Sequence, residues 1–85
     1  MLNSIEWTIR AARQLLKLEK VMQLRIRDGV EGLRTFPATT NVKRLVGHKY
    51  LYRLRVANYR IFFQFDGVIQ VVTIEEVRKR DEHTY

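Results

Sequence analysis

Several residue types are scarce or missing in this chain, and each absence excludes a class of protein. The 85 residues include no cysteine, two histidines and one proline. Without cysteine there is no disulfide scaffold, thiolate metal site or cysteine nucleophile, and two distant histidines make a poor metal site. No apolar run approaches the roughly 18 residues that a membrane span requires. We therefore expect no metal, no cofactor and no membrane attachment.

Acidic residues are also few relative to basic ones. Sixteen Lys and Arg against nine Asp and Glu give a net charge of +7. Such an excess on a short chain favours binding to a nucleic acid or to an acidic protein. The positive charge is concentrated in a stretch without acids, residues 41–60, and in a second run, residues 78–80. The basic residues of the first stretch are Lys43, Arg44, Lys49, Arg53, Arg55 and Arg60.

The first half of the chain has helical patterns. Residues 4–7 are typical of a short strand, and Thr8 is placed to cap the helix that follows. A second helix is expected over residues 19–33, and Pro37 ends the helical region. The apolar residues of the first helix recur at helical spacing: Ile9, Ala12, Leu15 and Leu16.

The second half is strand-like throughout. The turn signals are Ala57-Asn58 and Asp66-Gly67, each of which predicts a two-residue hairpin loop. Residues 42–46 have a weaker strand pattern, and the expected sheet has four strands without them. The three clear strands of this half are residues 50–56, 59–65 and 68–77.

Two-residue turns fix which residues pair across the sheet. They pair Val56 with Tyr59 and Phe65 with Val68, and they give the sheet one apolar face. The opposite face is polar and carries Arg55 directly across from Arg60. We therefore predict one α+β domain over residues 1–85, in which two N-terminal helices cover one face of a four-stranded, mainly antiparallel sheet in the order β-α-α-β-β-β. The residues of the polar face are Arg53, Arg55, Arg60, Phe62, Gln64, Val71 and Thr73.

The row of arginines on this face indicates an anionic partner, because like charges brought together across a sheet are unfavourable on their own. A guanidinium binds phosphate through two parallel hydrogen bonds and stays charged at physiological pH. Phe62, expected to be exposed among the arginines, offers a surface for base stacking. With RNA, the same face could assist attack of a 2′-OH on the adjacent phosphate without a metal. The alternative is a plain binding surface.

These segments resemble a known family. The stretch LYRLRVANYRIFF, the Asp66-Gly67 turn, the apolar strand after it and the ending RKRDEHTY are similar to the RelE/ParE superfamily of toxins from bacterial toxin–antitoxin pairs. The helical IRAARQLLKLEKVMQLRI is similar to the paired N-terminal helices of that superfamily. The resemblance implies a microbial-RNase-like fold and a cognate antitoxin with an acidic surface as partner.

In RelE-like members the arginine after the tyrosine of this motif stabilises the transition-state phosphate, and Arg60 occupies that position. The resemblance implies that Arg53, with Arg55 beside it, holds the phosphate and helps activate the 2′-OH. It implies that Arg80, or alternatively Arg78, contributes further charge from the end of the long strand.

The C-terminus supplies the remaining groups in this resemblance. Tyr85 corresponds to a tyrosine that acts on the proton or stacks on the base, and His83 is placed to act in its stead. Leu51 stands where many RelE-like nucleases have another basic residue, so the identity of the general base stays open. Other residues are expected to bind RNA: Lys43, Arg44, Lys49, Arg55, Phe62, Arg78 and Lys79.

The expected function is that of a cytoplasmic toxin that cleaves mRNA on the ribosome and is neutralised by its antitoxin. Its partners would be the antitoxin, the ribosome and mRNA. The alternative within the same superfamily is a ParE-like toxin, which inhibits DNA gyrase and is not a nuclease. Arg60 alone does not choose between the two branches, because both share the YRI-type strand.

Overall fold

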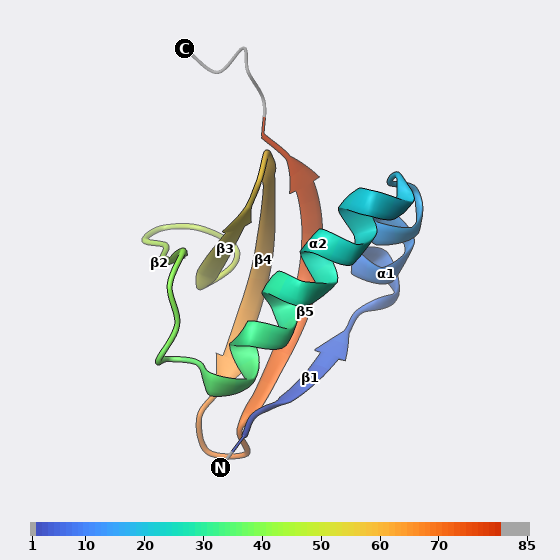
Figure 1. Cartoon of the computed structure of the whole chain (residues 1–85). Coiled ribbons are helices and arrows are strands. Elements are labelled where there is room, and N and C mark those ends of the chain that lie inside the picture. Colours follow the sequence, from blue (N-terminus) through green and yellow to red (C-terminus); the bar gives the residue numbers. More distant parts are fainter. Residues whose placement is uncertain (1, 81–85) are drawn as a thin grey trace.

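Two helices cover one face of a mixed five-stranded sheet in the computed structural model of this protein, which describes residues 2–80 (Figure 1). This arrangement confirms the predicted α+β class. No helix in the described part of the chain has the length and apolar content needed to cross a bilayer. The elements, with a 3₁₀ helix η1, are β1 Ser4–Trp7, α1 Ile9–Leu16, α2 Lys20–Glu31, η1 Gly32–Thr35, β2 Val42–Arg44, β3 Tyr52–Val56, β4 Tyr59–Asp66 and β5 Val71–Lys79.

The predicted number of strands was wrong. The sheet has the strand order β1-β5-β4-β3-β2, and the fifth strand is β2, which lies at the edge beside β3. Val42 of β2 lies across from the buried Leu54, so this short segment extends the apolar face. Its three residues are too few to show a clear alternating pattern, which is why the sequence pattern predicted four strands and not five.

Helix α1 begins at the predicted cap and lies along β5. The Thr8 hydroxyl accepts a hydrogen bond from the Ala11 N–H (3.1 Å), as an N-cap does. β1 pairs with β5 only as far as Trp7 opposite Ile74. Beyond that point the Gln14 side-chain oxygen accepts a hydrogen bond from the Val77 N–H (2.6 Å). This side chain therefore satisfies a strand edge that has no further strand beside it.

Helix α2 packs closely against β3, and a glycine makes the approach possible. A Cβ on Gly29 would lie 2.7 Å from Cγ2 of Val56. The core between the helices and the sheet is formed by both helices, η1 and three strands. Its buried residues are Ala11, Leu15, Ile26, Val30, Leu33, Phe36, Leu54, Ile61, Phe63, Val72, Ile74 and Val77.

Replacing Gly29 with alanine is expected to lower the free energy of unfolding by about 1–2 kcal/mol, because the stiff Val56 side chain must move. The matched control is Gly32→Ala, since a Cβ there meets nothing within 4 Å and its φ of −61° suits any residue. Chemical denaturation of both variants measures the difference. Equal stability of the two variants would contradict this account of the helix–sheet contact.

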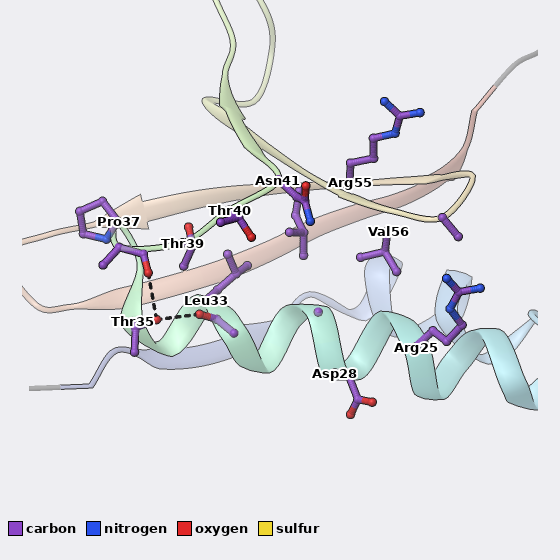
Figure 2. A pocket seen from close by; sticks show the side chains of 15 residues that line it. Arg25, Asp28, Leu33, Thr35, Pro37, Thr39, Thr40, Asn41, Arg55 and Val56 are labelled. Atoms are coloured by element: carbon purple, nitrogen blue, oxygen red, sulfur yellow. Dashed lines mark hydrogen bonds between the residues drawn. The ribbon is translucent and has the colours of Figure 1, made fainter.

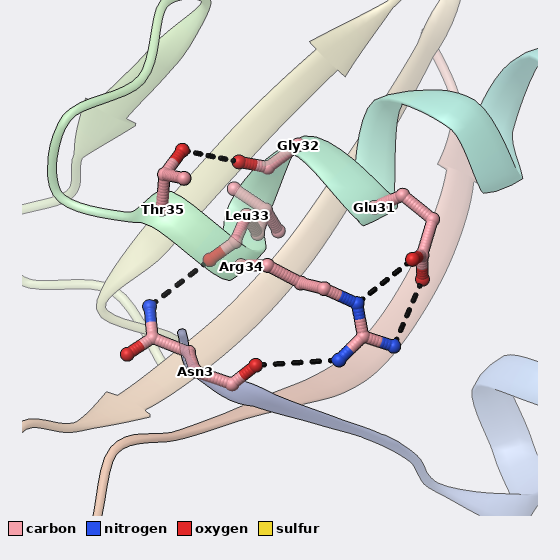
Figure 3. A network of polar contacts seen from close by, with 6 residues as sticks. All are labelled: Asn3, Glu31, Gly32, Leu33, Arg34 and Thr35. Carbon is pink, nitrogen blue, oxygen red and sulfur yellow. Dashed lines mark hydrogen bonds and ion pairs between the residues drawn. The ribbon is translucent and has the colours of Figure 1, made fainter. Parts of the chain in front are cut away.

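The N-terminal segment is fixed to η1 by polar contacts (Figure 3). The Asn3 side chain, 3% exposed, donates to the carbonyl oxygens of Leu33 (3.1 Å) and Phe36 (2.8 Å). Arg34 donates to the Asn3 carbonyl oxygen and to both carboxylate oxygens of Glu31. The Arg34 hydrogen bond lowers the pKa of Glu31. These bonds hold β1 at the sheet edge opposite β2.

Candidate functional site

The β3–β4 hairpin has the register that the sequence predicted. Arg55 lies across from Arg60, and Arg53 lies across from Phe62. The turn between the strands is the expected Ala57-Asn58, although the positive φ is at Ala57 (51°) and not at Asn58. The core residues of both strands face the helices, so Arg53, Arg55 and Arg60 lie together on the other face of the sheet.

The predicted register of the β4–β5 hairpin was wrong. Phe65 pairs with Val72 rather than Val68, because the turn spans residues 67–70. The Asp66 carboxylate accepts hydrogen bonds from the N–H groups of Val68 (2.9 Å) and Ile69 (3.3 Å), which closes a longer loop than the two-residue form. The shift is an even number of residues, so Val71 and Thr73 keep their predicted face.

A β-bulge then brings further positive charge to the arginine row. Phe63 pairs with Ile74 but Phe62 pairs with Glu76, so β5 holds one extra residue at this point. Because of the extra residue, the β5 side chains after the bulge point to the opposite face from the one that strict alternation predicts. Arg78 therefore lies across from Arg60, on the arginine face. The backbone N–H of the next outward residue, Arg80, donates to the Asn58 carbonyl oxygen (2.6 Å).

Four arginines from three segments line one small cleft of about 70 Å³, which we call the arginine cleft. The Nε of Arg53 is buried there and has no hydrogen-bond partner. Burial, together with the positive charges of the other three arginines, lowers the pKa of Arg53. The cleft is lined by Arg53, Arg55, Ala57, Asn58, Tyr59, Arg60 and Arg80.

Carboxylates do not neutralise the β3 and β4 arginines of this cleft within residues 2–80. The pairs between Arg10 and Glu76 (3.9 Å) and between Arg34 and Glu31 (2.8 Å) involve none of these arginines. An oxyanion that accepts several hydrogen bonds at once would reduce the repulsion between these arginines and would give the buried Nε–H of Arg53 an acceptor. The cleft therefore has the geometry and charge of a phosphate-binding site.

The structure divides the other predicted RNA-binding residues between the two faces of the sheet. Lys43 pairs with Arg53 and Arg78 with Arg60, so both share the arginine face. Arg44 pairs with Tyr52 and Lys79 with Tyr59, which places both on the helix-covered face. Lys49 lies in the loop before β3, with its Nζ 5.4 Å from the centre of the Tyr50 ring. The predicted catalytic residues His83 and Tyr85 lie outside the described residues.

The predicted exposure of Phe62 was wrong. Its side chain is on the arginine face but is only 6% exposed. The loop of residues 45–51 covers it, with the His48 ring stacked on the Phe62 ring (centroids 5.1 Å apart, planes at 14°) and the Tyr50 ring at 5.5 Å. No sequence pattern predicts this contact, because it joins residues 14 positions apart through a loop with no regular pattern.

A larger groove, of about 800 Å³, separates α2 from β3 and residues 37–41 (Figure 2). Arg25 and Asp28 of α2 and Arg55 of β3 line it, and the Arg55 guanidinium points away from the helix. Thr35 closes one end by hydrogen bonds to the carbonyl oxygens of Gly32 and Ala38. The groove has mixed polarity and no convergent set of like charges, so the anion-binding geometry belongs to the arginine cleft.

The titratable residues that line the arginine cleft are its four arginines and Tyr59. In the described ranges, no three His, Asp or Glu side chains come together in a way that could hold a metal ion. Arginine supplies positive charge and hydrogen bonds, but it exchanges protons poorly at neutral pH. The described cleft can therefore bind and polarise a phosphate, while proton transfer requires a further group.

Comparison with known proteins gives a family and a fold. A model of the family described as "ParE toxin of type II toxin-antitoxin system, parDE" matches residues 5–83. The chain superposes on a chain of the archaeal RelE–RelB complex of Pyrococcus horikoshii with a TM-score of 0.82 at 22% identity, covering 96% of this chain and 99% of that one. The isolated RelE toxin of E. coli gives 0.80 at 18% identity, with 96% and 88% covered.

A chain of the RelBE2 toxin–antitoxin complex of Mycobacterium tuberculosis gives a TM-score of 0.80 at 23% identity, with 94% of this chain and all of that chain covered (100%). At such identities the likeness establishes a shared fold. No curated protein sequence matches the chain.

Proposed function

The chain belongs to the ParE toxin family of type II toxin–antitoxin systems, within the RelE/ParE superfamily, and on this premise we propose that it is an mRNA endoribonuclease that acts on the ribosome. The observation that carries the proposal is the arginine cleft. Its buried Arg53 Nε lacks a partner, and no carboxylate in residues 2–80 neutralises the β3 and β4 arginines. A surface of this kind is stabilised when it receives a phosphate.

In the proposed reaction the 2′-OH of one nucleotide attacks its own 3′-phosphate. The bond to the 5′-oxygen of the next nucleotide breaks, which leaves a 2′,3′-cyclic phosphate and a 5′-OH. Arg60 and Arg53 hold the phosphate and stabilise the negative charge of the pentacoordinate transition state, and Arg80 adds charge from the end of β5. One proton leaves the 2′-OH and one reaches the 5′-oxygen, and we assign this transfer to His83 and Tyr85.

The test is to map the 5′ ends of mRNA on translating ribosomes after addition of the protein. The proposal predicts new ends that carry a 5′-OH, at positions within the reading frame. Intact message on ribosomes whose translation has stopped would contradict it.

A second function is favoured by one observation, the match to the ParE family model itself. On that alternative the protein inhibits DNA gyrase without cutting RNA, and the arginine face binds DNA or protein. A supercoiling assay with purified gyrase, run beside the mRNA assay, separates the two. Gyrase inhibition with uncut message selects the alternative.

The partners follow from the same proposal. The similar chains from Pyrococcus horikoshii and Mycobacterium tuberculosis come from complexes with antitoxins. We propose an antitoxin for this chain as well, with an acidic segment that complements a net charge of +7. The ribosome and mRNA would be the targets, and the cytoplasm the location.

A further inference from the structure

The 45–51 loop lies over the arginine face as an ordered structure. The Leu45 N–H donates to the Leu51 carbonyl oxygen (2.8 Å), which closes the loop. The Leu51 N–H donates to the Gln64 side-chain oxygen of β4 (3.0 Å), which fixes the loop to the sheet. Gly47 has a φ of +65°, in the left-handed region that glycine adopts without strain. The loop therefore presents its side chains in a fixed place.

His48 is held in this loop as an outer aromatic layer. Its ring lies nearly parallel to the buried Phe62, with an angle of 14° between the planes. Its Nδ1 accepts a hydrogen bond from the Tyr50 N–H (3.0 Å), which sets the orientation of the ring. Tyr50 is itself 5% exposed, and its hydroxyl accepts a hydrogen bond from Arg10 of α1 (3.3 Å). His48 is exposed, although one face of its ring lies against Phe62.

The position of this ring relates it to the arginine cleft. Phe62 pairs directly with Arg53 across the sheet, and directly paired residues have Cβ atoms about 5 Å apart. A ring that lies over Phe62 is therefore on the same face of the sheet as Arg53, at the neighbouring strand position. A phosphate in the arginine cleft and a base on the His48 ring lie within the reach of one stretch of nucleic acid.

We propose that His48 is a nucleobase platform for single-stranded RNA, on which a base next to the phosphate in the arginine cleft stacks. This inference rests on the proposed function and adds a binding residue to it. Aromatic rings bind bases with little sequence preference, because every base has a π-face. Phe62 supports the platform from beneath, so the stack has three layers: Phe62, His48 and the base.

The experiment measures binding of a short, fluorescently labelled single-stranded RNA in which every ribose is 2′-O-methylated, so that it cannot be cleaved. His48→Phe keeps an aromatic ring but loses the Nδ1 acceptor. His48→Asn loses the ring but keeps an oxygen that can accept from the Tyr50 N–H. We expect His48→Phe to bind within about 3-fold of the wild type, and His48→Asn to bind about 5- to 100-fold more weakly.

A second measurement changes the RNA instead of the protein and begins with the wild type. The same RNA is made with an abasic residue at each position in turn, and one of these probes should bind the wild-type protein about 5- to 100-fold more weakly. That probe should bind His48→Asn and the wild type equally, because there is no base left to stack.

The remaining outcomes overturn the proposal. Wild-type affinity in both His48 variants contradicts the platform. Weaker binding of the same RNA by Arg60→Ala would then show that the arginines still bind phosphate. If both variants bind the RNA equally weakly, His48 acts only by holding the shape of the loop, and the platform is ruled out. A wild-type protein that does not bind the RNA overturns the platform, while the proposed function, which concerns mRNA on the ribosome, is decided separately by the mapping of 5′ ends.

Discussion

Replacement of Arg60 by alanine is expected to lower the rate of mRNA cleavage by about 10²–10³-fold with the fold intact. Arg60 lies at the centre of the arginine row, opposite Arg55 on one side and Arg78 on the other. A fixed donor aimed at charge that develops in the transition state contributes a factor of this size. The loss should appear in single-turnover cleavage at saturating ribosome concentration, because it concerns the chemical step.

Arg60→Lys separates charge from geometry. A lysine keeps the positive charge but cannot donate two parallel hydrogen bonds to one phosphate, so it should recover only part of the activity. The matched control is Arg27→Ala, which removes the same charge from an exposed position on α2, away from the arginine cleft. Cleavage by Arg60→Ala within a few-fold of the control would contradict the catalytic assignment. In that case the gyrase alternative would gain support.

Replacement of Arg53 by methionine is expected to make the free protein more stable and to lower its activity by about 10²-fold. Burial and three neighbouring positive charges lower the pKa of Arg53, which means that folding disfavours its charged form. At neutral pH the guanidinium remains charged and therefore destabilises the fold. Methionine keeps a long apolar side chain and removes both the repulsion and the unpartnered Nε.

Thermal denaturation measures the gain in stability. A like charge directly opposite in a sheet, as Lys43 is to Arg53, costs about 0.2–1 kcal/mol, so the melting temperature should rise by about 1–8 °C. Added phosphate should raise the melting temperature of the wild type more than that of Arg53→Met, since the anion supplies the missing partner. A lower melting temperature in Arg53→Met would show that this arginine stabilises the free fold, and the cleft would then not be organised for an anion.

The two hairpins show how far the sequence could predict the site. The β3–β4 register was correct, because a two-residue turn between two alternating strands leaves little freedom. The β4–β5 register was wrong, because Asp66-Gly67 is followed by a longer loop in which Val68 and Ile69 are exposed. The hydrogen bonds to the Asp66 carboxylate stabilise the longer loop. The register that this loop gives packs the apolar residues of β5 against the core.

The bulge in β5 was beyond the reach of the sequence pattern. It changes the face on which Arg78 lies, and it depends on how Val77 fits the core beneath α1. The burial of Phe62 has the same origin. The alternating pattern assigned its face correctly, but only the folded 45–51 loop shows that His48 and Tyr50 cover it.

The sequence by itself determined the class of fold, the start of α1 and the placement of Arg53, Arg55 and Arg60 on one face. These features follow from local periodicity, a helix cap and a short turn, which involve residues close together in the chain. Only the tertiary structure showed that β2 is a fifth strand, that Arg78 and Arg80 lie beside that row, and that His48 and Tyr50 pack over Phe62. Each of these depends on contacts between segments far apart in the chain, where the gain from packing outweighs the local preference.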